Sequence, residues 1–269
     1  MTTILFTAFS NRSDALELAS EAVRGLRDLD IESSTCFLDQ DNAPQLSSDS
    51  LVISLGGDGT FLRSARLAHA HGARVLPVNL GRIGFLLDVP SDQIVASVRG
   101  ALVNPRVVER LALAISIEGQ STSDFALNEV VLGRSQVGHM VRVRTFVGED
   151  EYLTYSADGV LVATPTGSTG YNFSAGGPVV DAGLNVVVIT PIAPHFTIDR
   201  SIVVDSATTV RLVADDKPAV VVADGNQIGV LEPGQSVWVS QSPTPVKVVS
   251  SGAFELGVRL RQSLREGHA

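Results

Sequence analysis

The stretch LVISLGGDGTFLRSARLAHAHG, residues 51–72, joins an apolar run to a helical pattern through a turn that is mostly glycine. Gly56, Gly57 and Gly59 remove side chains where something must come close to the main chain. Asp58 is then the only strong hydrogen-bond acceptor in the turn. The phosphates of a nucleotide and one of its hydroxyls are the candidate ligands of this turn, and the stretch alone does not decide between them. The alternative is a tight turn in which Asp58 only caps the following helix.

The residues on both sides of this stretch repeat the alternation of strand and helix. Strand-like runs occupy residues 2–9, 34–38, 51–55 and 74–80, and helical spacing occupies residues 13–29, 60–72 and 91–102. Strands that alternate with helices require crossover connections, which give a parallel sheet. Residues 1–103 are therefore predicted to form a doubly wound α/β nucleotide-binding domain.

The pattern changes after about residue 104, where short runs rich in Val, Ile and Thr alternate with Gly, Pro, Asn and Asp. Residues 104–251 are predicted to form a β-rich dinucleotide-binding domain. The tail returns to helical spacing, with Leu256, Leu260 and Leu264 on one face. We expect a helix over residues 252–266 that packs back on the first domain, and a ligand between the domains at the carboxyl ends of the parallel strands.

Composition narrows the class of protein. The chain has 269 residues, 44% of them hydrophobic, and a net charge of -9. The negative charge argues against nucleic-acid and anionic-membrane partners. The single cysteine, Cys36, excludes an internal disulfide and fits a reducing compartment. Without a signal-peptide pattern or an apolar run of about 18 residues, the sequence predicts a soluble cytoplasmic protein.

Two further stretches offer side chains that could recognise a nucleotide. DGVLVATPTGSTGYNFSAGGP, residues 158–178, crowds hydroxyl and amide side chains between glycines, and Tyr171 could stack on a base. LNEVVLGR, residues 127–134, puts Asn128 and Glu129 at the head of a strand, where an amide and a carboxylate can bind ribose hydroxyls. The alternatives are a Ser/Thr-rich surface loop and a strand-end pair that meets water.

The combination of motifs resembles the NAD kinases. The motifs are GGDGT, NLGRIGFL, LNEVVLGRSQVGHM, ADGVLVATPTGSTGYNFSAGGPVV, TPIAPH and ADGNQIGVL, in that order. The resemblance covers roughly residues 50–235 and implies the two-domain architecture of that family. It also implies an enzyme that transfers a phosphoryl group to the 2′-hydroxyl of the adenosine ribose of NAD, giving NADP.

Carried over motif by motif, the resemblance implies that Asp58 is the general base. It implies that Asn128 and Glu129 contact the ribose and adenosine, and that Asp158 holds the nicotinamide end. The candidate substrate-binding residues are Gly56, Gly57, Gly59, Arg63, Asn128, Glu129, His139, Ser156, Asp158, Thr169, Gly170, Tyr171, Asn172, Ser174 and Asn226. Gly170 stands where relatives usually carry alanine, Ser156 where several carry arginine, and Asn226 where many carry glutamine.

The expected partners are NAD and a phosphoryl donor, which is ATP, another triphosphate or polyphosphate. Mg²⁺ is expected with the donor, held largely by phosphates and water, and no metal-ligating residues are predicted. The family resemblance suggests a homodimer or homotetramer. Two other functions remain open: a lipid or sphingoid-base kinase of the related GGDGT group, and a non-catalytic NAD-binding protein. The sequence leaves the roles of His195, Arg63 and Arg66 open.

Overall fold

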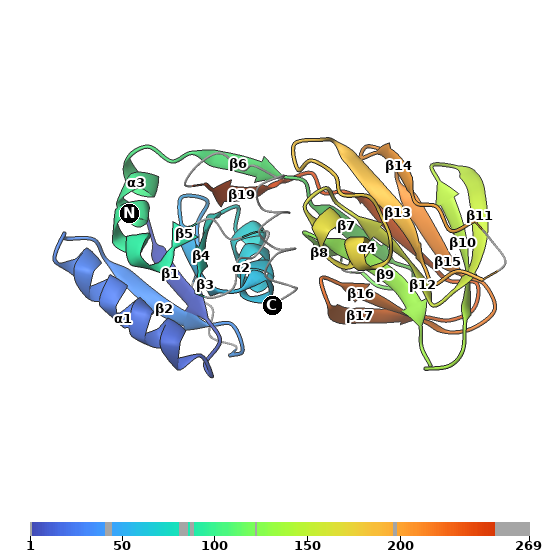
Figure 1. Ribbon diagram of the computed structural model, residues 1–269, viewed down its shortest axis with the longest axis horizontal. Helices are drawn as coiled ribbons and strands as arrows, with labels where there is room; N and C mark the ends of the chain where they lie inside the picture. Colours follow the sequence, from blue (N-terminus) through green and yellow to red (C-terminus); the bar gives the residue numbers. More distant parts are fainter. Residues whose placement is uncertain are drawn as a thin grey trace. The chain divides into compact units, whose positions relative to one another are not determined.

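The computed structural model describes residues 2–40, 45–80, 86, 89–121, 123–195 and 198–250 (Figure 1). The chain divides into two compact units, one of residues 1–109 and 246–269 and the other of residues 110–245. The helix expected over residues 252–266 lies outside the described residues.

The first unit is built on a seven-stranded sheet with the order β2-β1-β3-β4-β19-β6, and β5 pairs with β4. Strands β1, β2, β3 and β4 pair in parallel, as the alternation of strand and helix predicts. The elements are β1 (Ile4–Ala8), α1 (Ser13–Arg27), β2 (Ser33–Phe37), β3 (Leu51–Gly56), α2 (Asp58–Ala70), β4 (Arg74–Asn79), β5 (Val89–Pro90), η1 (Ser91–Gln93), α3 (Ile94–Val103), β6 (Val107–Arg110) and β19 (Val246–Val249).

Helices cover both faces of this sheet. Neighbouring side chains of a strand point to opposite faces. Phe6 packs in one buried cluster with residues of α1 and α3, whereas the hydroxyl of Thr7 lies 2.8 Å from that of Ser64 in α2. Helices α1 and α3 therefore cover one face and α2 the other. The prediction of a doubly wound α/β domain is confirmed.

Strand β19 differs from the sequence analysis, which placed residues 246–251 in the β-rich domain. The structure pairs β19 in parallel with β4, through Lys247 with Arg74 and Val248 with Val75. Composition could not reveal this, because a short run of valines fits either sheet. The chain therefore returns to the first unit after completing the second.

The second unit is a β-sandwich of two six-stranded sheets, with the orders β11-β10-β15-β18-β7-β8 and β14-β13-β12-β9-β16-β17. Its elements are β7 (Leu113–Ile117), β8 (Ser123–Ala126), β9 (Glu129–Arg134), β10 (Val141–Val147), β11 (Asp150–Ala157), β12 (Gly159–Ala163), η2 (Gly167–Thr169), α4 (Tyr171–Ser174), β13 (Val186–Ile192), β14 (Ile202–Asp205), β15 (Val210–Ala214), β16 (Ala219–Ala223), β17 (Asn226–Leu231) and β18 (Ser236–Gln241).

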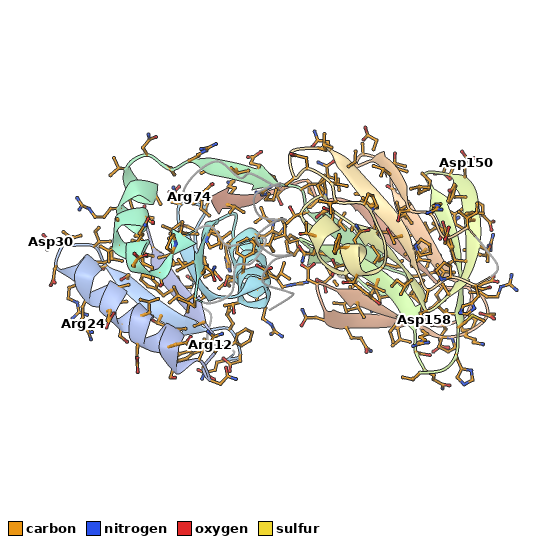
Figure 2. The ribbon with its side chains drawn as sticks, viewed as in Figure 1. Arg12, Arg24, Asp30, Arg74, Asp150 and Asp158 are labelled. Carbon is orange, nitrogen blue, oxygen red and sulfur yellow. The ribbon has the colours of Figure 1, made fainter. Side chains whose placement is uncertain are left out.

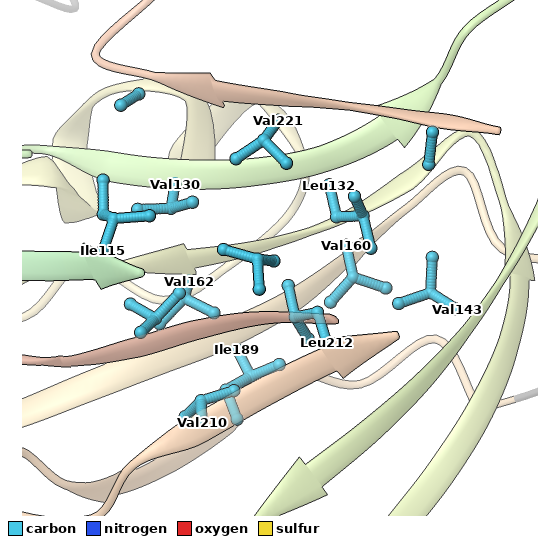
Figure 3. Close-up of a cluster of buried hydrophobic side chains, with 14 of the residues drawn as sticks. Ile115, Val130, Leu132, Val143, Val160, Val162, Ile189, Val210, Leu212 and Val221 are labelled. Carbon is cyan, nitrogen blue, oxygen red and sulfur yellow. The ribbon is translucent and has the colours of Figure 1, made fainter. Parts of the chain in front are cut away.

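Alternating residues of the two sheets fill the core between them. Val143 and Leu212 come from the first sheet, and Leu132, Val160 and Ile189 come from the second (Figure 3). The other face of the second sheet carries a smaller apolar cluster that includes Leu161 and Val180. Val180 follows α4, so the segment that contains η2 and α4 is held against this outer face. The prediction of a mostly β second domain is confirmed.

Candidate active site

The glycine turn of the first unit leaves its backbone open. Gly56 ends β3, and a Cβ there would stand 2.3 Å from the hydroxyl oxygen of Thr60, so this position requires glycine for packing. By contrast, a Cβ on Gly57 or Gly59 would meet no heavy atom of the described residues within 4 Å. With respect to these residues, the turn leaves space beside the first backbone N–H groups of α2, which suit an anion such as phosphate.

Asp58 is the first residue of α2 rather than its cap. The capping position is Gly57, with extended backbone and no side-chain capping bond, so the alternative in which Asp58 caps the helix is wrong. The carboxylate of Asp58 is partly exposed and accepts a hydrogen bond from the Leu86 N–H at 3.4 Å. Asp58 thus stands at the positive end of the helix dipole, where an ionised carboxylate is stabilised.

Arg63 lies at the carboxyl edge of the same sheet. Its guanidinium stands 5.3 Å from the ring centre of Phe9, which follows β1. Asp39, after β2, accepts hydrogen bonds from the N–H of Ser10 at 3.0 Å and from its hydroxyl at 2.5 Å. Those bonds lower the pKa of Asp39, and the charge of Arg63 lowers it further. Asp58 and Arg63 therefore belong to one polar edge of the first unit.

In the second unit, the carboxylate of Asp224 binds the backbone N–H groups at Asn128 and Glu129. Asp224, just after β16, has a left-handed backbone with φ of 46°. Its carboxylate accepts hydrogen bonds from the N–H groups of Leu127 at 2.7 Å, Asn128 at 2.8 Å and Glu129 at 3.2 Å. Strands β8 and β9 are separated at Leu127 and Asn128, whose N–H groups donate to Asp224.

Thr164 holds the same backbone from the other side. Its N–H donates to the carbonyl of Asn128 at 2.8 Å, and its hydroxyl donates to the carbonyl of Leu127 at 2.6 Å. The Thr164 hydroxyl in turn accepts the N–H of Gly167 at 3.0 Å. The segment after β12 is thereby fixed against the head of β9.

Two side-chain oxygens at the head of β9 are buried with no hydrogen-bond partner in the part of the chain that the structure describes. They are Oδ1 of Asn128 and Oε2 of Glu129, which we call the acceptor pair. The Glu129 residue is only 8% exposed. Burial raises its pKa to about 7, the nearby charge of Asp224 adds to the increase, and a hydrogen bond from the Tyr171 backbone opposes it. Unsatisfied buried acceptors are costly, so the acceptor pair is suited to receive donors from a ligand.

The η2–α4 segment brings three of the sequence-predicted residues beside the acceptor pair. A Cβ on Gly170 would stand 3.2 Å from Oε2 of Glu129, and Thr169 and Tyr171 flank this glycine. Tyr171 is 44% exposed, and an exposed tyrosine can stack on a ligand. Ser174 is exposed at the end of α4. Asn226 lies close by, because its amide donates to the carbonyl of Asp224 at 3.2 Å.

Asn172 is placed differently from the expectation of a ligand contact. It is fully buried. Its amide nitrogen donates to the carbonyls of Ser168 at 3.1 Å and Pro178 at 2.9 Å, and its oxygen accepts the hydroxyl of Thr190 at 2.7 Å. In this structure the Asn172 side chain fastens the η2–α4 segment to β13.

A second group of predicted residues lies at the far end of the same strands. Asp158, which is labelled in Figure 2, lies in the turn before β12. Its carboxylate forms an ion pair with Arg134 at 2.5 Å. Arg134 ends β9 whereas Glu129 begins it, which separates them by about 17 Å at the rise of an extended strand. The structure therefore does not bring Asp158 together with the acceptor pair within the unit.

Ser156, His195 and His139 belong to this far end. The carbonyl of Ser156 accepts the N–H of His195 at 2.8 Å. His139 is exposed and, with Arg134 and Lys217, lines a cavity of about 270 Å³. The candidate residues of the second unit thus form two groups at opposite ends of β9.

Sequence reasoning missed Asp224 and did not assign a role to Thr164 or Gly167. One signal was present, since ADGNQ places an Asp-Gly turn between two strand-like runs. That signal predicts a turn but does not say what the carboxylate binds.

The described residues contain no group of three or more His, Cys, Asp or Glu side chains that could hold a metal ion. Within the same described ranges, no helix is long and apolar enough to cross a membrane.

An α/β unit with an open glycine turn and a β-sandwich with a buried acceptor pair define a two-domain nucleotide-binding enzyme. Residues 7–107 match the ATP-NAD kinase N-terminal domain, and residues 127–251 match the ATP-NAD kinase C-terminal domain. The chain belongs to the NAD kinase family.

Similar proteins agree with this assignment. An NAD kinase of Heliobacterium modesticaldum is 39% identical over 81% of this chain and 79% of its own length. NAD kinase 1 of Streptomyces avermitilis is 33% identical over 90% of this chain and 80% of its own length.

Solved structures share the fold. An NAD kinase from Archaeoglobus fulgidus in complex with ATP has a TM-score of 0.77 at 25% identity, and the match covers 97% of this chain and 99% of that one. Yeast NADH kinase complexed with NADH has a TM-score of 0.85 at 19% identity, covering 100% of this chain and 89% of that one.

Proposed function

We propose that this chain is an NAD kinase that phosphorylates the 2′-hydroxyl of the adenosine ribose of NAD, giving NADP, with ATP or another phosphoryl donor. The observation that carries the proposal is the acceptor pair. Ribose hydroxyls are hydrogen-bond donors, and Oδ1 of Asn128 and Oε2 of Glu129 are buried acceptors that need donors. Tyr171 and Gly170 beside them suit a base stacked against a bare backbone.

In this proposal Asp58 accepts the proton of the attacking hydroxyl. An aspartate is ionised at neutral pH, and orientation of the hydroxyl contributes together with proton acceptance. The open backbone at Gly57 and Gly59 holds the donor phosphates at the start of α2, and Arg63 adds positive charge at the same edge. When bound with the donor, Mg²⁺ neutralises charge on the phosphates.

The remaining expectations belong to the same proposal. Asp158, Ser156 and His139 bind the nicotinamide end of NAD, Thr169 and Ser174 line its path, and Asn226 supports the adenosine end. The enzyme is a homodimer or homotetramer located in the cytoplasm.

The test is a grid of donors against acceptors. NAD, NADH and a sphingoid base are each incubated with ATP or polyphosphate in the presence of Mg²⁺, and products are separated by chromatography. We expect NADP from NAD. Phosphorylated lipid without NADP supports the lipid-kinase alternative, and NAD binding without any product supports a non-catalytic NAD-binding protein.

A further inference from the structure

The conformation of Asn128 and Glu129 depends on a side chain far away in the sequence. The Asp224 carboxylate collects three consecutive backbone N–H groups, those of Leu127, Asn128 and Glu129, at 2.7 to 3.2 Å. The Asp224 N–H also donates to the carbonyl of Glu129 at 3.1 Å. Three donors on one carboxylate stabilise its ionised form and fix the backbone that carries them.

This backbone sets the direction of the acceptor pair. Regular strand pairing would satisfy these N–H groups with a neighbouring strand, but β9 begins only at Glu129. On the opposite side the carbonyls of Leu127 and Asn128 are used by Thr164. The backbone of Leu127 and Asn128 is therefore bound through both its N–H and its carbonyl groups, which fixes the point from which the Asn128 side chain starts.

Asp224 also affects the charge of Glu129. Among the described residues, it is the one charged group whose field raises the pKa of Glu129. The η2–α4 segment presents the Tyr171 N–H and Gly170, and β12 presents Ala163 opposite Glu129. None of these groups is charged, and the neighbour Asn128 is neutral. A change at position 224 therefore alters both the geometry and the ionisation of Glu129.

We propose that Asp224 is a positioning residue that aims the acceptor pair at the ribose hydroxyls of NAD through its hydrogen bonds with three backbone N–H groups. The inference rests on the proposed function. Asp224 acts through Asn128 and Glu129 and does not itself receive the substrate.

The test compares the full chain with the variant Asp224→Asn. Asparagine replaces one carboxylate oxygen of Asp224 with an NH₂ group. That group would face either the Leu127 N–H or the N–H groups of Asn128 and Glu129, so a donor would meet a donor and the hydrogen bond would be lost. We expect KM for NAD to rise about ten-fold or more, because a hydrogen bond to a charged group is lost, with a smaller change in kcat. Asp205→Asn is the matched control, since Asp205 also accepts a turn N–H, that of Ala207, at 2.8 Å.

The pH profile separates positioning from general damage. In the unmodified chain, kcat/KM for NAD should rise with pH to a plateau above about 7 as Glu129 ionises. Removing the charge of Asp224 lowers the pKa of Glu129, so the rise should move to lower pH in Asp224→Asn and not in Asp205→Asn. Structural damage alone would lower activity at every pH without moving the rise.

Each outcome bears on the proposal. If the unmodified chain forms no NADP, the proposed function fails rather than this inference. If the chain is active and Asp224→Asn keeps the KM and pH profile of the control, the inference is overturned. Should Asp224→Asn fail to fold, Asp224→Ser takes its place with the same expectations. Failure of both to fold also overturns the proposal, because Asp224 would then be required for the fold itself.

Discussion

Gly167 lies directly against the backbone of Asn128: a Cβ at position 167 would stand 2.1 Å from the Asn128 carbonyl oxygen. The obstacle is main chain, which cannot rotate away as a side chain can. The η2–α4 segment can therefore approach the acceptor pair only if residue 167 is glycine. This contact joins the two polar stretches that the sequence shows separately.

We predict that Gly167→Ala separates the η2–α4 segment from Asn128. Overpacking of this kind costs about 1–3 kcal/mol, and a backbone obstacle places the cost at the upper end. Urea unfolding should show the loss of stability, and KM for NAD should rise. Gly100→Ala in α3 is the control, because a Cβ there meets no atom of the described residues within 4 Å and alanine favours a helix. Equal behaviour of the two variants would contradict the prediction.

Asp58→Asn should lower kcat by about 10²–10⁴-fold, the usual contribution of a general base. NAD binding should persist, because Asp58 belongs to the first unit and the acceptor pair to the second. Steady-state kinetics and equilibrium titration with NAD measure the two effects. Asp92→Asn, also an acidic residue at the start of a helical segment, should leave both unchanged. Full turnover in Asp58→Asn would remove this residue from the proposed mechanism.

Local sequence patterns were enough to predict much of the fold. The stretch around residue 56 predicts strand, turn and helix, and the structure has β3 followed by α2. This succeeds because burial on both faces of a parallel strand gives a continuous apolar run, and because glycine marks the turn. The valine-rich runs likewise predict a β domain, but not which sheet each run joins. β19 shows this limit, since its pairing with β4 depends on contacts between distant parts of the chain.

The site shows the same division between local and distant information. Asn128 and Glu129 were recognisable as acceptors from residue type and from their place before a strand. Asp224 was not, because its partners are almost a hundred positions away and an Asp-Gly turn is common. Asn172 shows the converse: its residue type suits a ligand, but in this structure its amide is bonded to Ser168, Pro178 and Thr190. Residue type alone cannot tell a ligand contact from an internal one.

Asn172→Ala should therefore act mainly on stability. The change removes the donor to two buried carbonyls and the acceptor of a buried hydroxyl. We expect this loss to lower the free energy of unfolding by about 2–4 kcal/mol. Chemical denaturation of the full chain measures the change. Asn185→Ala, at an exposed position of the same unit, is the control and should be nearly neutral. A stable Asn172→Ala variant with weakened NAD binding would instead support a direct ligand contact.

Glu129→Gln should stabilise the protein in a pH-dependent way. The pKa of Glu129 is raised from 4.5 to about 7 in the folded state. Below about 4.5 the carboxyl is protonated in both states and has no linked effect. Between about 4.5 and 7 the unfolded chain releases its proton first, so the unmodified protein loses stability as pH rises, by at most about 3 kcal/mol above pH 7. Glutamine does not titrate and avoids this loss.

The thermal midpoint of Glu129→Gln minus that of the unmodified chain should therefore grow between pH 5 and 7.5 and then level off. Glu118→Gln is the control variant, at an exposed glutamate of the same unit that accepts the Ser236 N–H at 2.9 Å. A difference for Glu129→Gln that stays constant with pH would mean that this carboxyl is not held in a charge-disfavouring environment.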